Sequence, residues 1–154
     1  MTSPSAALTF RPGRHDDWPA VAALLADAGL PVADLDADSM PGFTVATRTS
    51  LPHETLVGSI GLQAFGEVGL LRSLVVAKSA RSAGCGSELV QAVERIASEM
   101  GVRELWLLTT DTAPYFETRG FRSVPRELSP AAIRETAEFS ALCPESAVLM
   151  RKSV

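Results

Sequence analysis

The sequence predicts an α/β protein with a mixed, mostly antiparallel central sheet and helices on both faces. Short apolar or alternating runs of strand length recur along the chain, and stretches with helical periodicity lie between them. One apolar run, Leu70–Val76, leads into a glycine-containing loop, residues 81–87, and then into an amphipathic helix. Such an order is typical of a domain in which helices cover a sheet.

The composition predicts one globular domain, residues 1–154, because 154 residues with 46% apolar content can close a single core. A net charge of −4 argues against a nucleic-acid or anionic-membrane surface. No apolar run approaches the roughly 20 residues of a membrane span, and the N-terminus lacks the basic start of a signal peptide. We expect a cytoplasmic protein with no metal, nucleic-acid or membrane partner, and we leave a homodimer open.

The first elements are a strand and a helix. Ala7–Arg11 is apolar enough for a strand, and Asp16–Pro19 offers an aspartate N-cap followed by a proline in the first helical turn. Gly29 can close this helix. Trp18 is interpreted as a core residue or as a lid over a cleft.

An acidic connector and a hairpin come next. Val32–Gly42 is either a solvated connector or a flap over a substrate site, and composition does not decide between them. Phe43–Arg48 and Thr55–Leu62 are predicted strands around a turn at Ser50–Glu54, with His53 solvated in that turn. The next turn is marked by Gly66 and Gly69, and it precedes the central strand.

The second half of the chain alternates helices and strands. A helix over Ser87–Met100 is predicted to present one apolar face. That face consists of Leu89, Val90, Val93, Ile96, Ala97 and Met100. The later predicted elements are strands at Leu105–Leu108, Phe121–Val124 and Ala147–Lys152, and helices at Ala113–Arg119 and Pro130–Glu135.

The loop after the central strand has the pattern Arg-x-x-Gly-x-Gly, formed by Arg81, Gly84 and Gly86. Glycines allow close approach to the main chain, and the first N–H groups of a helix favour a phosphate. The pattern is neither a Walker loop nor a dinucleotide fingerprint. An ordinary strand–turn–helix is the alternative, and then Arg81 would be a surface residue.

Together with the strand pattern Leu71, Leu74 and Val76 and the downstream Arg119-Gly120-Phe121, this loop resembles the GCN5-related N-acetyltransferases (GNAT). The resemblance runs from about residue 8 to residue 150 and implies a GNAT fold that uses acetyl-CoA as cosubstrate. It implies that the central strand pairs with the pantetheine arm and that the loop holds the diphosphate. The implied coenzyme-binding residues are Leu74, Val75, Val76, Arg81, Ser82, Ala83, Gly84, Cys85, Gly86, Ser87, Thr110 and Phe116. Relatives usually have a glycine where Ser82 stands.

The catalytic acid is the first point of departure from the family. Many relatives place a tyrosine four residues before the Gly-Phe pair, where this chain has Phe116, and Tyr115 comes one residue earlier. One residue along a helix is a rotation of about 100°. Tyr115 is therefore a candidate acid for the thiolate, and protonation by water is the alternative. Thr110 stands where relatives often have an asparagine.

A catalytic base is also uncertain from the sequence. Leu70 occupies the place of a carboxylate in many relatives, and Glu67, just before it, either acts through water or caps a turn. Arg72 is a charge within an apolar strand and needs either an acidic partner or an anionic ligand. With Ser73, Arg72 is a candidate clamp for the anionic group of the acceptor.

The finer resemblance, carried by residues 131–150 and the GLLRSLVV strand, is to acetyltransferases of arsenic-resistance operons. It implies a small, anionic, amino-acid-like acceptor such as arsinothricin or phosphinothricin. Cys143 and Cys85 make a poor arsenic site, and Cys143 is interpreted as a buried structural cysteine. Two other classes stay open: a CoA-binding sensor or interaction module with little catalysis, and a general amine or protein N-acetyltransferase.

Overall fold

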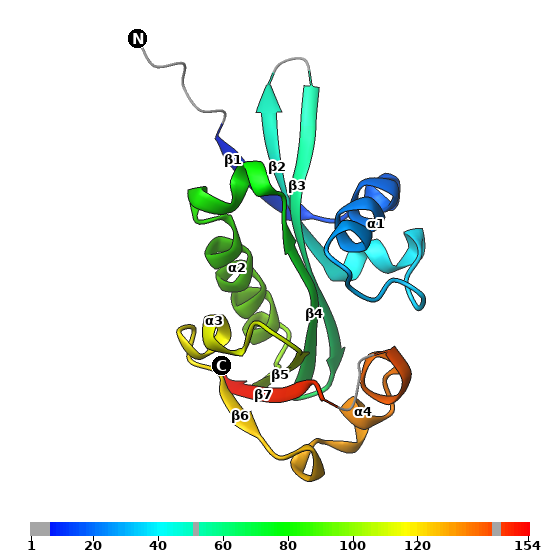
Figure 1. Cartoon of the computed structure of the whole chain (residues 1–154), viewed down its shortest axis with the longest axis vertical. Coiled ribbons are helices and arrows are strands. Elements are labelled where there is room, and N and C mark those ends of the chain that lie inside the picture. Colours follow the sequence, from blue (N-terminus) through cyan, green and yellow to red (C-terminus); the bar gives the residue numbers. More distant parts are fainter. Residues whose placement is uncertain (1–6, 51–52, 143–145) are drawn as a thin grey trace. The chain divides into compact units, whose positions relative to one another are not determined.

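The structure is a computed structural model, and it describes residues 7–50, 53–142 and 146–154 (Figure 1). Backbone contacts divide the chain into two compact units. The first unit consists of Met1–Gly61 and Ser73–Val93, and the second consists of Leu62–Arg72 and Glu94–Val154. The prediction of a single domain over residues 1–154 stays a prediction.

The described strands form one mixed sheet in the order β1-β2-β3-β4-β5-β7-β6. The strands are β1 (Leu8–Pro12), β2 (Phe43–Ser50), β3 (His53–Phe65), β4 (Val68–Val76), β5 (Glu104–Thr109), β6 (Arg122–Val124) and β7 (Val148–Ser153). The pairs β1–β2, β2–β3, β5–β7 and β6–β7 are antiparallel, and β4–β5 is parallel. The predicted α/β class with a mixed sheet is confirmed.

Helices of several kinds connect these strands. The α-helices are α1 (Trp18–Asp27), α2 (Cys85–Glu99), α3 (Ala113–Glu117) and α4 (Ala131–Arg134). The short 3-10 helices are η1 (His15–Asp17), η2 (Ala37–Gly42), η3 (Lys78–Ala83) and η4 (Arg126–Leu128), and η5 (Glu138–Leu142) is a π-helical turn. None of the helices in the described part of the chain has the length and apolar composition needed to cross a membrane.

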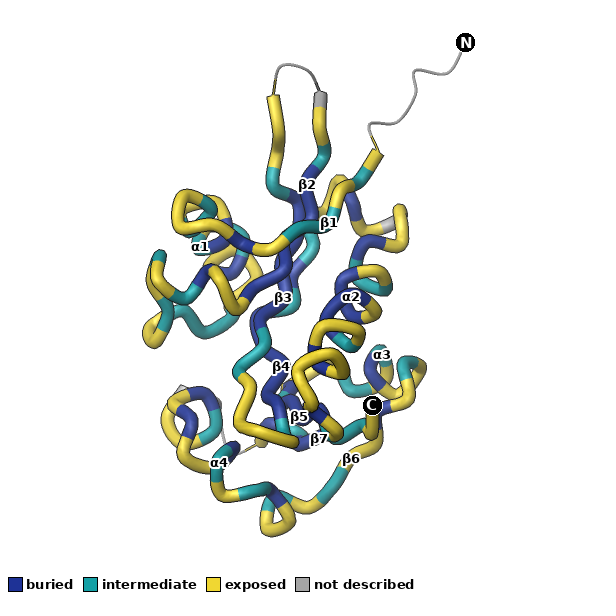
Figure 2. Tube along the Cα trace, turned by 180° about the vertical axis from the view of Figure 1, so that it is seen from behind, coloured by how far each residue is buried: buried dark blue, intermediate teal, exposed yellow. Residues whose placement is uncertain are grey.

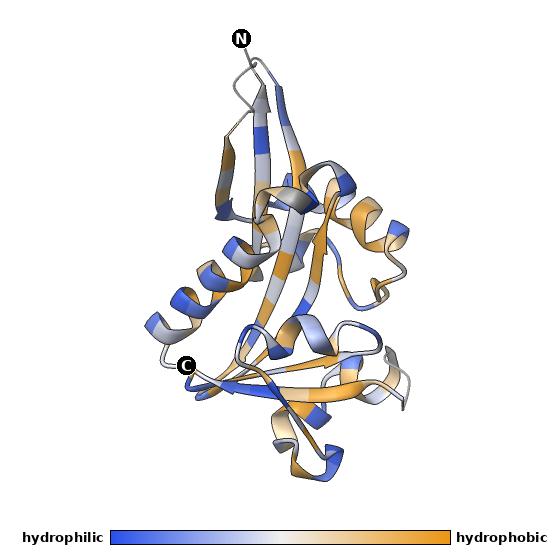
Figure 3. Cartoon of the chain, turned by 60° about the vertical axis from the view of Figure 1, so that its left-hand side comes forward, coloured by the Kyte–Doolittle hydropathy of each residue, from blue (hydrophilic) through white to orange (hydrophobic). Residues whose placement is uncertain are grey.

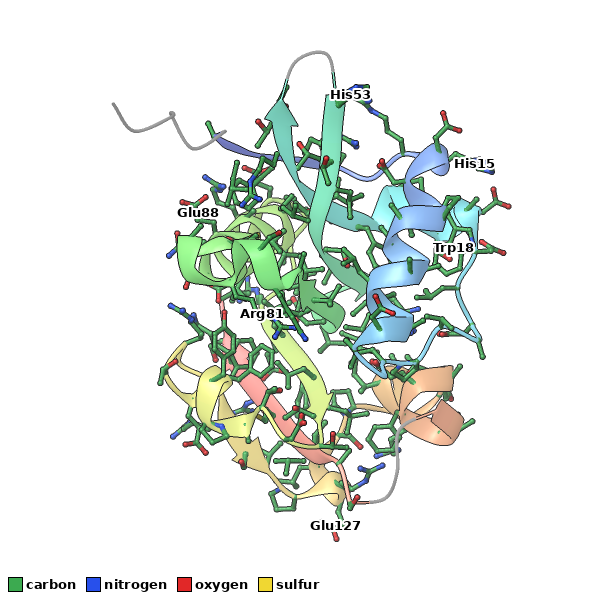
Figure 4. All side chains as sticks on the ribbon, turned by 45° about the horizontal axis from the view of Figure 1, so that its top comes forward. His15, Trp18, His53, Arg81, Glu88 and Glu127 are labelled. Carbon is green, nitrogen blue, oxygen red and sulfur yellow. The ribbon has the colours of Figure 1, made fainter. Side chains whose placement is uncertain are left out.

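In the first unit, α1 packs on one face of β2. Val21 and Leu25 are fully buried and form one apolar cluster with Phe43, Val45 and Val75 (Figure 2). Burying each such large side chain contributes about 1.5–3 kcal/mol. Trp18, labelled on α1 in Figure 4, is partly buried against the same cluster, which agrees with the core interpretation.

The start of α1 is fixed by an ionic network. Asp17 is the N-cap residue and Pro19 lies in the first turn, as predicted. The carboxylate of Asp17 does not cap α1, however, because it accepts hydrogen bonds from Arg11 at 2.8 and 2.9 Å and from the Arg14 N–H at 2.6 Å. These bonds hold the pKa of Asp17 below its ordinary value. The network ties β1 to the helix.

The second unit has its own core between β4, β5, β7 and the C-terminal helices. Leu70, Trp106, Ile133 and Leu149 are buried together. Leu105, Trp106 and Leu107 are all buried, so β5 is covered on both faces, as its continuous apolar run predicted.

Several predicted boundaries differ from the structure. His53 lies in β3, paired with Ser50, so the hairpin extends beyond the predicted turn. Gly69 is buried within β4, while Gly66 is the turn residue with a positive φ of 67°. α3 ends at Glu117, before Arg119. Cys143 and residues 51–52 lie outside the described residues.

The helix α2 begins at Cys85, two residues before the predicted start. Its solvent side is hydrophilic, as Figure 3 shows, and its inner face buries Leu89 and Val93. Ile96 and Met100 were predicted to share this buried face, but they are 37% and 58% exposed. Ala97, in the last turn, is fully buried, and Met100 lies just beyond Glu99, the last residue of α2.

Candidate active site

In the first unit, the segment after β4 consists of a 3-10 helix, a left-handed glycine and the start of an α-helix. η3 ends at Ala83, Gly84 has a left-handed φ of 74°, and α2 begins at Cys85. The Glu88 N–H donates to the Gly84 carbonyl at 3.1 Å, as the first bond of the new helix. The first N–H groups of an α-helix generally have no partner within that helix. They form a donor set suited to an anion.

The two glycines of this segment serve different purposes. No atom lies within 4 Å of the position that a Cβ would occupy at Gly84, so glycine is required there by its conformation and not by space. Gly86 lies in the first turn of α2 and does not have a positive φ. The helical conformation does not require a glycine at position 86, and a glycine there lets a ligand come close to the main chain.

The Cys85 side chain has a structural role, and its thiol is not in a reactive environment. Its side chain is fully buried, and burial raises the pKa of the thiol above its ordinary value. A Cβ at Gly58 would come within 3.2 Å of Cys85 Sγ and 3.1 Å of Leu89 Cδ1. The glycine on β3 therefore lets α2 approach the sheet closely.

Arg81 is exposed, and its Nε donates to the Val76 carbonyl at 3.0 Å. This bond links η3 to the last residue of β4. Figure 4 labels Arg81 and Glu88 on opposite sides of the ribbon that carries both. Ser82 and Ala83 complete η3, so the predicted loop is largely helical.

β4 is irregular immediately before the predicted coenzyme strand. Ser73 has φ 60° and is the only non-glycine residue with a positive φ in the described ranges. A left-handed residue inside a strand is typical of a β-bulge, which redirects the main chain that follows. The fully buried Ser59 on β3 donates its hydroxyl to the Ser73 carbonyl at 3.0 Å. This arrangement was not predicted, because nothing in the sequence marks a serine as left-handed.

Leu74, Val75 and Val76 follow this bulge. Val75 is buried in the α1 cluster, while Leu74 and Val76 are half-buried. The described parallel register with β5 covers only Val68–Leu70. The coenzyme candidates Leu74–Val76 and Arg81–Ser87 thus belong to one unit and one continuous segment.

The remaining candidates belong to the second unit. Glu67 is 76% exposed in the β3–β4 turn, with its carboxylate 3.7 Å from Arg103 Nε, and its carbonyl accepts from the Arg103 and Glu104 N–H groups. This geometry gives the turn-capping interpretation a physical basis. Arg72 is only 4% exposed, as expected for a charge that engages a partner.

Tyr115 and Phe116 lie side by side in α3. Phe116 is buried and makes edge-to-face contacts with Tyr115 at 5.2 Å and with Phe121 at 5.6 Å between ring centroids. The Tyr115 hydroxyl is buried and has no hydrogen-bond partner among the described residues. Thr110 is exposed directly after β5. A buried hydroxyl without a partner is unusual and marks Tyr115 as a functional candidate.

A left-handed residue within β4, a left-handed glycine and a helix N-terminus follow one another in this α/β protein, and such a segment is suited to bind a phosphate through main-chain N–H groups. The chain belongs to the acetyltransferase (GNAT) family, whose family model matches residues 11–121.

Relatives and solved structures agree with this family. The amino-acid acetyltransferase of Pseudomonas putida (strain GB-1) is 42% identical over 66 residues, which are 43% of this chain and 15% of that protein. N-acetylglutamate synthase from Neisseria gonorrhoeae, solved with coenzyme A and N-acetyl-glutamate, superposes with a TM-score of 0.81 at 21% identity, over 98% of this chain and 36% of that one. Rv2747 from Mycobacterium tuberculosis, solved in complex with CoA, has a TM-score of 0.79 at 20% identity over 95% and 99% of the two chains. The GNAT fold predicted from the sequence is confirmed.

Proposed function

We propose that this protein transfers an acetyl group from acetyl-CoA to the amine of a small, anionic amino acid. The observation that carries the proposal is the left-handed Gly84, which joins η3 to α2 after β4, the strand that contains the left-handed Ser73. This segment offers main-chain donors for a diphosphate, and membership of the GNAT family supports acetyl-CoA as the donor of the acetyl group.

The reaction needs a neutral amine, a polarised thioester and a proton for the departing thiolate. In this proposal the main chain of Leu74–Val76, redirected by the bulge at Ser73, pairs with the pantetheine arm and donates an N–H to the thioester oxygen. The amine attacks the carbonyl carbon, the carbon–sulfur bond breaks, and the amine loses its proton to solvent or to a base. Glu67 is the candidate base and acts through water.

Tyr115 is the proposed donor of the proton to the thiolate. Its hydroxyl is buried and lacks a hydrogen-bond partner among the described residues, so it is available to a ligand atom. Phe116 and Thr110 are proposed to contact the coenzyme arm. If Tyr115 has no part in the reaction, water protonates the thiolate.

The acceptor is proposed from the relatives and from Arg72. The Pseudomonas putida relative is named for amino-acid acetylation, although the match covers only 15% of its length. An arginine that is 4% exposed forms its strongest bonds with carboxylates or similar oxyanions. Arg72 and Ser73 are the proposed contacts for the acceptor's anionic group. Glutamate-like acids are the first candidates, and phosphinothricin- and arsinothricin-like acids are the second.

The test is a thiol-release assay with acetyl-CoA and a panel of matched acceptors. The panel contains glutamate, glutamine, phosphinothricin and spermidine, which differ in the charge of the group beyond the amine. Turnover that is highest with glutamate or phosphinothricin and low with glutamine and spermidine is expected. Turnover only with spermidine would refute the acceptor class. CoA binding without turnover on any amine would favour the sensor or interaction module.

A further inference from the structure

Three basic side chains surround the segment that carries Gly84, and the sequence pattern includes only one of them. Arg81 follows from the Arg-x-x-Gly-x-Gly pattern. Lys78 is exposed at the first position of η3. Arg48, from β2, donates from Nη2 to the carbonyl of Ser79 in η3 at 3.2 Å. All three belong to the first unit.

The direction of Arg48 follows from the alternation of β2. Phe43 and Val45 point to the α1 side of the sheet, where they join the apolar cluster. Arg48 has the opposite parity along the strand, so its side chain projects from the other face. Gly58 on β3 lies against Leu89 and Cys85 of α2 on that face. The hydrogen bond to Ser79 agrees with this direction.

None of these three cations forms an ion pair with a carboxylate in the part of the chain that the structure describes. The protein as a whole has a net charge of −4, so a local group of cations without acidic partners is notable. The charge of Arg48 also reaches the first turn of α2. Burial raises the pKa of the Cys85 thiol, and Glu88 raises it further, while Arg48 opposes both.

We propose that Arg48 binds a phosphate group of the coenzyme, as a second arginine beside Arg81. The inference rests on the proposed function, because it takes CoA as the ligand of this segment. One N–H of the guanidinium is used by Ser79, and the others are oriented by that bond. A guanidinium held in this way loses little freedom when it binds an oxyanion, and its planar fork matches phosphate oxygens.

The alternative is that Arg48 only braces η3. Two substitutions separate the two roles, because Arg48→Lys removes the planar guanidinium and Arg48→Gln removes the charge. Arg48→Lys keeps the charge, and Arg48→Gln keeps an N–H donor for the Ser79 carbonyl without the charge. Arg122→Gln is the matched control, since Arg122 is exposed on β6 and loses the same charge.

The experiment measures CoA binding by calorimetry at low and high salt, without an acceptor amine. The ligands are CoA, 3′-dephospho-CoA and pantetheine. Arg48→Gln is expected to raise the Kd of CoA by about tenfold, as for the loss of one charge-assisted hydrogen bond. It should also flatten the salt dependence of binding. Arg48→Lys should lie between Arg48→Gln and the wild type, and Arg122→Gln should match the wild type.

The three ligands identify the phosphate. If Arg48→Gln weakens CoA but not 3′-dephospho-CoA, Arg48 binds the 3′-phosphate. If it weakens both equally and leaves pantetheine unchanged, Arg48 binds the diphosphate.

The proposal is overturned in favour of the brace if Arg48→Gln weakens the binding of all three ligands equally. It is also overturned if CoA binds to Arg48→Gln as tightly as to the wild type but more weakly to Arg48→Lys. Unchanged CoA binding in both variants would also overturn it. The proposed function fails separately, if the wild-type protein binds no CoA.

Discussion

Replacing Gly84 by alanine should strain the segment between η3 and α2 without creating a steric clash. The φ of 74° is left-handed, and no atom lies within 4 Å of the added Cβ. A left-handed alanine costs about 1–2 kcal/mol. At the size of this protein, each kcal/mol lowers Tm by roughly 2–4 °C. Gly84→Asn is the control, because asparagine tolerates this conformation far better than alanine.

The strain can appear in either of two measurements. If the segment keeps its conformation without ligand, Gly84→Ala lowers the free energy of unfolding. If the segment relaxes, CoA must restore the left-handed turn, and the Kd of CoA rises by about tenfold for each 1.4 kcal/mol. Chemical denaturation and calorimetry on the same protein measure both, and their sum should approach the expected strain.

The reasoning is refuted if Gly84→Ala changes neither quantity, or if Gly84→Asn is impaired as strongly as Gly84→Ala. Gly86 provides an internal contrast. Because Gly86 is in the first turn of α2, alanine should not destabilise the fold. Gly86→Ala should instead weaken CoA alone, if the diphosphate lies against that turn.

Three further predictions concern single side chains. Tyr115→Phe should leave the free energy of unfolding unchanged or higher, since it removes a buried hydroxyl without a described partner, and should lower kcat by at least about 100-fold if Tyr115 is the acid; an unchanged kcat would remove Tyr115 from the mechanism. Ser59→Ala should lower the free energy of unfolding by about 1–3 kcal/mol, because it leaves the Ser73 carbonyl without its 3.0 Å donor, and the exposed Ser123→Ala should not. Asp17→Asn should lower stability by about 1.5–3 kcal/mol at neutral pH. Arg11 lowers the pKa of Asp17 in the folded state below the ordinary value of 3.8. The stability difference between the wild type and Asp17→Asn should therefore be constant above pH 3.8 and vanish as the pH falls through the lower pKa of the folded state. A stability difference that persists in strong acid would contradict the ionic origin.

Much of the fold could be predicted because hydrophobic periodicity and helix-end residues act locally. Asp17 occupies the N-cap position of α1 and Pro19 lies in its first turn, as the sequence predicted. The predicted helix near Pro130 is observed as α4. Boundaries were less accurate where a second element changes the outcome, as at His53, which β2 holds in the hairpin.

The candidate site was predictable only where it depends on the main chain of a continuous segment. Gly84 was identified from the Arg-x-x-Gly-x-Gly pattern, which lies within one continuous stretch, and such a pattern does not extend to partners from distant strands. Ser59 and Arg48 reach this segment through β3 and β2 by hydrogen bonds to carbonyls. Nothing in their local sequence distinguishes them from other surface or core residues. Ser73 was singled out as a neighbour of Arg72, but its left-handed φ has no counterpart in a sequence pattern.

The division of β3, β4 and α2 between the two units has a consequence for how this chain is made. The first unit cannot be finished during synthesis until Val93 has left the ribosome, although residues belonging to the second unit, Leu62–Arg72, emerge earlier. Those residues must wait for the remainder of their own unit, Glu94–Val154. A nascent chain that pauses before Val93 would therefore present the start of β4 without its parallel partner β5. Cutting the gene at any single point would divide at least one of the two units.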